Sequence, residues 1–106
     1  MNNNVLGDLQ RHIVRSFIDT IILSEIRKAN YLGGYTLMEL VLQKFGFLMS
    51  AGTIYAHLYS LERKDLIKAA PSEETKKYVL TEKGTKTIEL IIESKGYIIT
   101  FFETVF

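Results

Sequence analysis

The chain of 106 residues contains no cysteine, no tryptophan and only one proline. Without cysteine it can form no disulfide, no thiolate metal site and no cysteine nucleophile, and such a chain suits a reducing compartment. No apolar run approaches the roughly 20 residues that a membrane-spanning helix needs. The segment MNNNVLGDLQRH lacks the basic and then apolar order of a signal peptide. We therefore expect a cytoplasmic protein with no membrane partner.

The chain also has no marked excess of positive or negative charge. Its 13 Lys and Arg residues and 12 Asp and Glu residues leave a formal net charge of +1. A strongly basic balance would have pointed directly to nucleic acid. Residues 50–80 are hardly more basic, with five Lys or Arg against four Asp or Glu. Any DNA-binding surface must therefore come from the local arrangement of charges. Hydrophobic residues make up 47% of the chain, which predicts one packed domain over residues 1–106.

Signatures of catalysis are missing as well. His12 and His57 are the only histidines, and neither stands at metal-ligand spacing from a carboxylate. The chain has no glycine-rich phosphate loop and no nucleophile elbow. We expect no catalytic residue, no metal site and no cofactor, and therefore a protein that is not an enzyme.

The N-terminal part has the apolar period of a helix. Apolar residues recur at three-to-five spacing from Leu9 to Ile26, which predicts a helix over residues 6–30. The apolar stripe is wide, so this helix is expected to contact neighbours on two sides. The adjacent glycines Gly33 and Gly34 then interrupt the chain, because glycine favours turns and weakens helices.

Residues 36–65 have the pattern of a helix-turn-helix. Thr36 is placed to cap a second helix, and Gly46 is placed to end it. After a short apolar connector, Ser50 is placed to cap a third helix. In that helix Ile54, Leu58 and Leu61 fall on one face, and hydroxyl-bearing and basic residues occupy much of the remainder.

Residues 66–80 are predicted to form two short strands, around 66–70 and 76–80, joined by a polar turn that contains Pro71. We call these strands and their turn the wing. A hydroxyl-rich helix followed by a basic hairpin is typical of a winged helix-turn-helix. The predicted fold class is mainly α (α+β): a winged helix-turn-helix with a two-stranded wing plus long N- and C-terminal dimerisation helices.

The last predicted helix covers residues 81–106 and begins at Thr81, a good N-cap. Its apolar residues repeat at seven, as in Ile91, Ile98 and Val105, which suits packing of one helix on another. The helix is apolar on more sides than one small domain can bury. We therefore predict a homodimer whose interface contains Ile91, Ile92, Ile98, Ile99, Phe102, Val105 and Phe106.

Three sequence blocks, GYTLMELV, SAGTIYAHLYSLERKDLI and KKYVLTEKG, resemble the DNA-binding domain of the PadR family of transcriptional regulators. The resemblance covers about residues 34–84. It implies a homodimeric cytoplasmic repressor that is often responsive to a small aromatic or drug-like ligand. The chain departs from the family where Ala56 replaces the usual proline and Ser60 a common basic residue. Lys64-Asp65 replaces the usual acidic-glycine turn.

The resemblance and the pattern together place double-stranded DNA against the Ser50 helix and the wing. In a winged helix this helix enters the major groove, and flanking groups hold phosphate. The candidates for phosphate contact in the helix are hydroxyl residues at its start and Arg63, and the candidates for base contact lie in its middle. The predicted DNA-binding residues are Ser50, Thr53, Tyr55, His57, Tyr59, Ser60, Arg63, Lys68, Lys76 and Lys77.

Two alternatives remain open at this stage. The near-neutral charge, Ser60 and the acidic turn Ser72-Glu73-Glu74 also fit a winged-helix module that binds protein without binding DNA. A salt series of duplex binding would separate the two, because a reader of several phosphates weakens steeply as salt rises. The second alternative concerns the C-terminal aromatic residues, which either pack in the dimer, the simpler interpretation, or line a ligand pocket: Tyr97, Phe101, Phe102 and Phe106.

Overall fold

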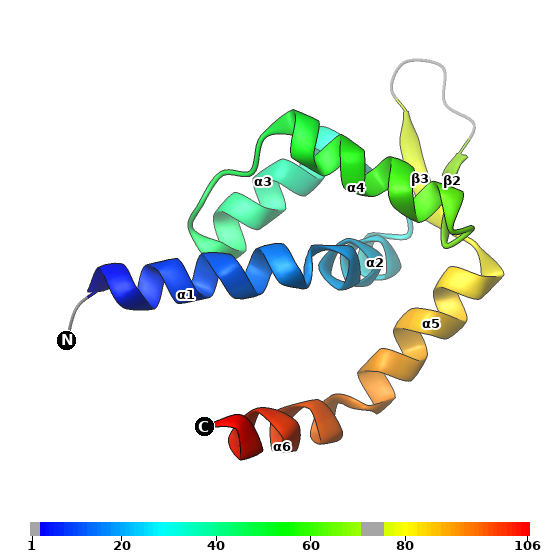
Figure 1. The fold of residues 1–106 in the computed structure, drawn as a ribbon. Helices are drawn as coiled ribbons and strands as arrows, with labels where there is room; N and C mark the ends of the chain where they lie inside the picture. Colours follow the sequence, from blue (N-terminus) through cyan, green and yellow to red (C-terminus); the bar gives the residue numbers. More distant parts are fainter. Residues whose placement is uncertain (1–2, 71–75) are drawn as a thin grey trace.

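The computed structural model describes residues 3–70 and 76–106 (Figure 1). The predicted turn at Pro71 and the acidic turn Ser72-Glu73-Glu74 lie outside the described residues. The elements follow the order of a winged helix. They are α1 (Asn3–Ser16), α2 (Ile18–Ala29), β1 (Leu32–Gly33), α3 (Gly34–Phe45), α4 (Ala51–Arg63), β2 (Ile67–Ala70), β3 (Lys77–Leu80), α5 (Glu82–Glu93) and α6 (Lys95–Val105).

Local capping signals set three helix ends as the sequence predicts: the end of α3 and the starts of α4 and α5. The Ser50 hydroxyl accepts a hydrogen bond from the Thr53 amide at 3.2 Å and starts α4. Gly46 ends α3 in the left-handed conformation, with φ of 78°. The start of α3 differs from the prediction, because Gly33 is its N-cap and Thr36 lies inside the helix.

Each of the two predicted terminal helices is divided. The backbone leaves helical geometry at Phe17, with φ of −105° and ψ of 14°, although its amide still bonds the Ile13 carbonyl at 3.0 Å. Ser94 separates α5 from α6, and its hydroxyl donates to the Leu90 carbonyl at 2.8 Å. Such a back-bond from serine bends helices. The bend turns α6 back toward the side of the molecule where α1 lies (Figure 1).

The sheet has three antiparallel strands in the order β1-β3-β2. The register of β2 and β3 pairs Ile67 with Leu80 and Ala70 with Lys77. The two-stranded wing is therefore confirmed, and β1 extends it by pairing Leu32 with Tyr78. The sequence did not predict β1, because two residues, one of them a glycine, carry no strand period of their own.

Helix α2 runs through the centre of the core. Ile22 and Ile26 in α2 are fully buried, and so are Ile54 and Leu58 in α4. Glu25 is also buried, which is unusual for a carboxylate, and pairs with Lys44 of α3 and with Lys28. No helix within residues 3–70 and 76–106 combines the length and the apolar character that a membrane crossing needs.

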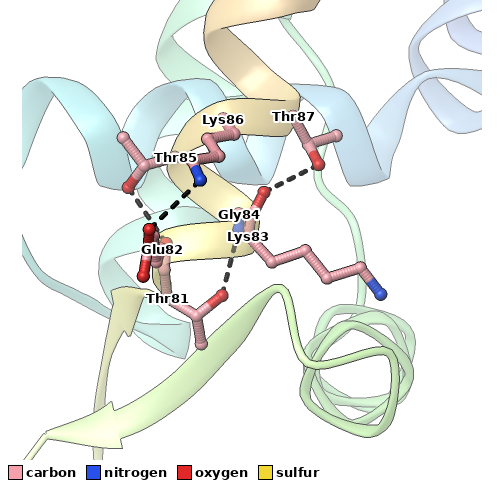
Figure 2. A network of polar contacts seen from close by, with 7 residues as sticks. All are labelled: Thr81, Glu82, Lys83, Gly84, Thr85, Lys86 and Thr87. Carbon is pink, nitrogen blue, oxygen red and sulfur yellow. Dashed lines mark hydrogen bonds and ion pairs between the residues drawn. The ribbon is translucent and has the colours of Figure 1, made fainter.

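The end of α4, the start of β2 and the start of α5 meet in one small region. Asp65 has φ of 60°, the left-handed conformation that the glycine usual in the family adopts most easily. The Thr81 hydroxyl donates to the Asp65 carbonyl at 2.6 Å and accepts from the Gly84 amide at 3.0 Å, capping α5 as predicted (Figure 2). The turn and the cap therefore fix where the wing leaves the core.

Tyr78 offers a test of packing at the base of the wing. Its side chain is fully buried, and its hydroxyl has no hydrogen-bond partner within the described residues. A buried unpaired hydroxyl costs about 1–3 kcal/mol. We therefore expect Tyr78→Phe to leave the free energy of unfolding unchanged or raise it by about 1 kcal/mol, whereas Tyr78→Ala should lower it by about 3–5 kcal/mol.

Urea unfolding at neutral and at high pH measures both effects. Burial raises the pKa of the Tyr78 phenol above its usual 10.0, by more than the Lys76 ammonium lowers it. The folded state therefore disfavours the phenolate, and stability should fall as pH rises past about 10. Tyr78→Phe should lose this part of the pH dependence. A loss of stability at neutral pH in Tyr78→Phe would show that the hydroxyl makes a bond in the folded protein.

Candidate nucleic-acid interface

Burial of one face of α4 decides which residues point outward. Ile54, Leu58 and Leu61 are at most 1% exposed, so the opposite face is turned to solvent. The exposed residues on that face are Gly52, Ala56, Tyr59 and Arg63. Sequence reasoning selected Tyr59 and Arg63 and missed the two small residues, although the same helical spacing locates them.

Three tyrosines form a row from α3 to the outer face of α4. The Tyr35 and Tyr55 rings lie 6.4 Å apart edge to face, and the Tyr55 and Tyr59 rings lie 6.2 Å apart. Gly34 sits against the Tyr55 ring, where a Cβ atom would lie 2.5 Å from Cζ. The Gly-Tyr pair at the start of α3 therefore both makes room for Tyr55 and packs against it. Tyr35 was not among the predicted site residues.

Lys76 continues this row toward the wing. Its Nζ lies 5.4 Å from the Tyr59 ring centre and 5.5 Å from that of Tyr78. It also lies 3.9 Å from Oε1 of Glu62, on α4. The Tyr78 phenol and then the Glu62 carboxylate raise the pKa of Lys76. A phenol carries charge only after it loses its proton, so Glu62 is the anion beside Lys76 at neutral pH.

His57 lies on the opposite flank of α4, toward α2. Its Nδ1 is 2.8 Å from Oδ1 of Asp19, and Nζ of Lys64 is 3.9 Å from Oδ2 of the same carboxylate. This contact joins residues 38 apart in the sequence, so no local pattern reveals it. A base contact by His57 stays a prediction, and the Asp19 contact makes it less favourable than one by Tyr59.

The candidate phosphate ligands lie at the two edges of the same surface. The Ser50 hydroxyl donates to the Thr53 hydroxyl at 2.9 Å, and both residues are exposed at the start of α4. Lys68 is exposed on β2, and Lys77 on β3 lies with its Nζ 4.8 Å from the Tyr31 ring centre. Neither lysine forms a salt bridge with any residue of the described ranges. The structure therefore brings the helix start and the wing strands to the flanks of α4's outer face.

The predicted dimer residues are all at least partly exposed in the single chain. Ile99 is 53% exposed, Val105 58% and Phe106 90%. Phe102 contacts Phe17, with ring centres 6.3 Å apart, at the junction of α1 and α2. No residue of α6 is buried. The chain alone therefore leaves this apolar face uncovered.

The alternative of a ligand pocket at the dimer interface stays untested, because the structure contains one chain. A shallow open hollow of about 440 Å³ lies along α5 and α6 and is lined by Glu93, Gly96, Tyr97 and Thr100. Of the four aromatic residues proposed to line a pocket, this hollow contains Tyr97 alone. Phe101, Phe102 and Phe106 lie outside its lining.

The geometry agrees with comparisons to known proteins. The family model of the transcriptional regulator PadR-like family matches residues 22–90. A search of curated proteins found no significant match. A PadR family transcription regulator from Clostridium difficile is 28% identical, with a TM-score of 0.74 over 84% of this chain and 97% of that chain.

Two further solved structures are similar. A winged-helix DNA-binding protein from STIV is 27% identical, with a TM-score of 0.64 over 76% of this chain and 88% of that chain. Bacillus subtilis PadR in complex with operator DNA is 19% identical, with a TM-score of 0.59 over 78% of this chain and 58% of that chain. This last likeness supports the fold alone.

Proposed function

Because the chain belongs to the transcriptional regulator PadR-like family, which consists of DNA-binding regulators and not enzymes, we propose that it is a homodimeric repressor. Its ligand in this proposal is a two-fold symmetric site in double-stranded DNA. Residues 1–106 act as one winged-helix domain. The observation that carries the proposal is the exposed outer face of α4, flanked on one side by the wing lysines.

The outer face of α4 suits insertion into the major groove. Gly52 and Ala56 are small, so the helix backbone can approach the base edges closely between the larger side chains. Tyr59 and Arg63 then reach bases or phosphates at one end of the helix. At the other end the Ser50 and Thr53 hydroxyls meet phosphate, where the helix dipole also favours an anion.

The wing strands supply the second phosphate contact. Lys68 and Lys77 carry charges that no described carboxylate neutralises, so both are available to DNA. Tyr55 is half-buried between Gly34 and its neighbouring tyrosines, which fixes the direction of its hydroxyl. A fixed hydroxyl holds phosphate in one register, and such contacts position a protein without reading sequence.

Two copies are needed in this proposal because α6 leaves an apolar face uncovered. The α6 helices of two protomers bury that face against each other and against the exposed apolar residues of α1. A two-fold axis there sets the two α4 helices toward successive major grooves, which predicts a palindromic site. In this proposal a small aromatic effector binds at the same interface, beside Tyr97.

Selection of bound sequences from a random duplex pool tests the function. We expect enrichment of a palindrome and binding that weakens steeply between 50 and 200 mM salt. A protein-binding winged-helix module is the second candidate, supported by the carboxylates that stand beside Lys64 and Lys76. Absence of duplex binding at low salt would favour that module and contradict the proposal.

Residues that contact phosphate and residues that contact bases should lose DNA affinity in different ways when they are replaced. Lys77→Gln should weaken binding to operator and to unrelated duplex by the same factor, because a phosphate contact carries no sequence information. Tyr59→Phe should instead change the preference at one base position by about 1–3 kcal/mol. Binding constants for operator, single-base variants and unrelated duplex measure both. If Tyr59→Phe lowered the affinity for all duplexes by the same factor, Tyr59 would not contact a base.

A further inference from the structure

The candidate DNA-binding lysines near α4 are of two kinds: some form a salt bridge with a carboxylate, and others do not. Lys76 lies beside the Glu62 carboxylate, whereas Lys77, the next residue, contacts the Tyr31 ring and has no carboxylate within salt-bridge distance in residues 3–70 and 76–106. Both lysines lie at the base of the wing, with Lys76 beside α4 and Lys77 over the Tyr31 ring on the other side of the strand. Their electrostatic contributions to DNA binding therefore need not be equal.

We infer that Glu62 is a positioning residue that competes with DNA phosphate for the Lys76 ammonium and so lowers the affinity for every duplex. The inference rests on the proposed function. Glu62 lies on the flank of α4 next to Tyr59, so its carboxylate borders the surface that DNA is proposed to cover. Its side chain is 35% exposed, and that of Lys76 is 49% exposed.

The aromatic rings keep the ammonium near this carboxylate. A cation within about 6 Å of a tyrosine ring centre is attracted to the ring face. Lys76 satisfies this distance for both Tyr59 and Tyr78. An exposed ion pair alone would hold a lysine weakly. Two rings and one carboxylate together hold the Lys76 ammonium between the base of the wing and α4. A DNA phosphate that binds Lys76 there must replace Glu62 as its partner.

Counting ions gives the consequence for DNA binding. A lysine that neutralises one phosphate releases one condensed cation, which adds about 0.9 to the slope of log affinity against log salt. If Lys76 leaves Glu62 to do so, the Glu62 carboxylate stays at the edge of the DNA as an unpaired negative charge. The two residues together then bring no net positive charge to the phosphates. Lys76 therefore adds little to the salt dependence, whereas Lys77 adds its full share.

The variants Glu62→Gln, Lys76→Gln and Lys77→Gln test this in the full chain. Glu62→Gln should raise affinity for an unrelated duplex by about 3–10-fold at 50 mM salt and steepen the slope by about 0.9. Between 50 and 200 mM salt the affinity should then fall about 3.5-fold further than in the unchanged protein. Lys76→Gln should leave the slope unchanged, and Lys77→Gln should reduce it by about 0.9.

The double variant Glu62→Gln/Lys76→Gln should have the same slope of log affinity against log salt as the unchanged protein. The steeper slope of Glu62→Gln requires the Lys76 ammonium. Glu89→Gln, an exposed change on α5, controls for the loss of one negative charge elsewhere and should leave the slope unaltered. Lower affinity in Glu62→Gln, or an unchanged slope while Lys77→Gln reduces it, would overturn the inference. Failure of the unchanged protein to bind any duplex at 50 mM salt would instead overturn the proposed function.

Discussion

Gly84→Ala is expected to destabilise the protein by about 3 kcal/mol or more, a large share of the roughly 5–15 kcal/mol that typically stabilises a folded domain. Gly84 lies in the first turn of α5, directly against the start of the wing (Figure 2). A Cβ atom there would lie 1.9 Å from the Leu66 carbonyl oxygen and 2.9 Å from its carbon. These atoms belong to the backbone, so no side-chain rotation relieves the overlap.

The surrounding hydrogen bonds prevent the backbone from moving aside. The Leu66 carbonyl accepts from the Thr81 amide at 3.1 Å, and the Leu66 amide donates to the Leu61 carbonyl at 3.0 Å. Shifting this peptide would disturb the end of α4, the register of the wing and the cap of α5 together. The glycine of the block KKYVLTEKG thus has a steric explanation in this chain.

Gly52→Ala provides the matched control. Gly52 lies in α4, and a Cβ atom there would meet nothing within 4 Å. Alanine is the better helix former, so this variant should be stabilised by about 0.5–1 kcal/mol. Chemical unfolding of both variants measures the difference. Equal stability of Gly84→Ala and the unchanged protein would mean that α5 does not pack against Leu66 as the structure shows.

The features predicted correctly from sequence are those set by neighbouring residues. A helix cap joins a serine or threonine hydroxyl to the amide three residues later, so its position can be predicted from the sequence. Ser50 and Thr81 were identified as caps in this way. The rotation of α4 follows from Ile54 and Leu58 in the same way. The left-handed turn at Gly46 depends only on local backbone preference.

The features that sequence reasoning missed depend on contacts between distant residues. Strand β1 exists because Leu32 pairs with Tyr78, 46 positions later in the chain. His57 is engaged by Asp19 on another helix. The bend at Phe17 occurs inside an unbroken apolar pattern, which predicts a helix on both sides and gives no sign of the angle between them.

The second large effect concerns the uncovered face of α6. Exposed apolar residues on this helix repeat at three and four positions, as helix-on-helix packing requires. Figure 1 shows α6 running back toward α1, whose own residues Leu6, Leu9 and Ile13 are 37–44% exposed. Adjoining exposed apolar faces on neighbouring helices are typical of interaction sites in soluble proteins. We expect a second copy to cover both.

The double variant Ile99→Lys/Val105→Lys should therefore convert the dimer into a folded monomer. Each side chain contributes roughly 1.5–3 kcal/mol when fully buried, and four would be replaced per dimer, so the dimer dissociation constant should rise about 100-fold or more. The free energy of unfolding of the monomer should change little, because both residues are already more than half exposed. Sedimentation and urea unfolding measure these two quantities.

Loss of the dimer should weaken operator binding much more than any single contact does. Two linked α4 helices bind two half-sites with a gain of about 10²–10⁴ over one, and the monomer loses that gain. Binding to a single half-site should remain, since the double variant leaves α4 and the wing intact. Leu42→Lys is the matched control, because Leu42 is 45% exposed on α3, away from α6, and should keep both dimer and operator affinity. A monomeric double variant that bound the full palindrome at undiminished affinity would show that α6 pairing does not link the two DNA-binding surfaces.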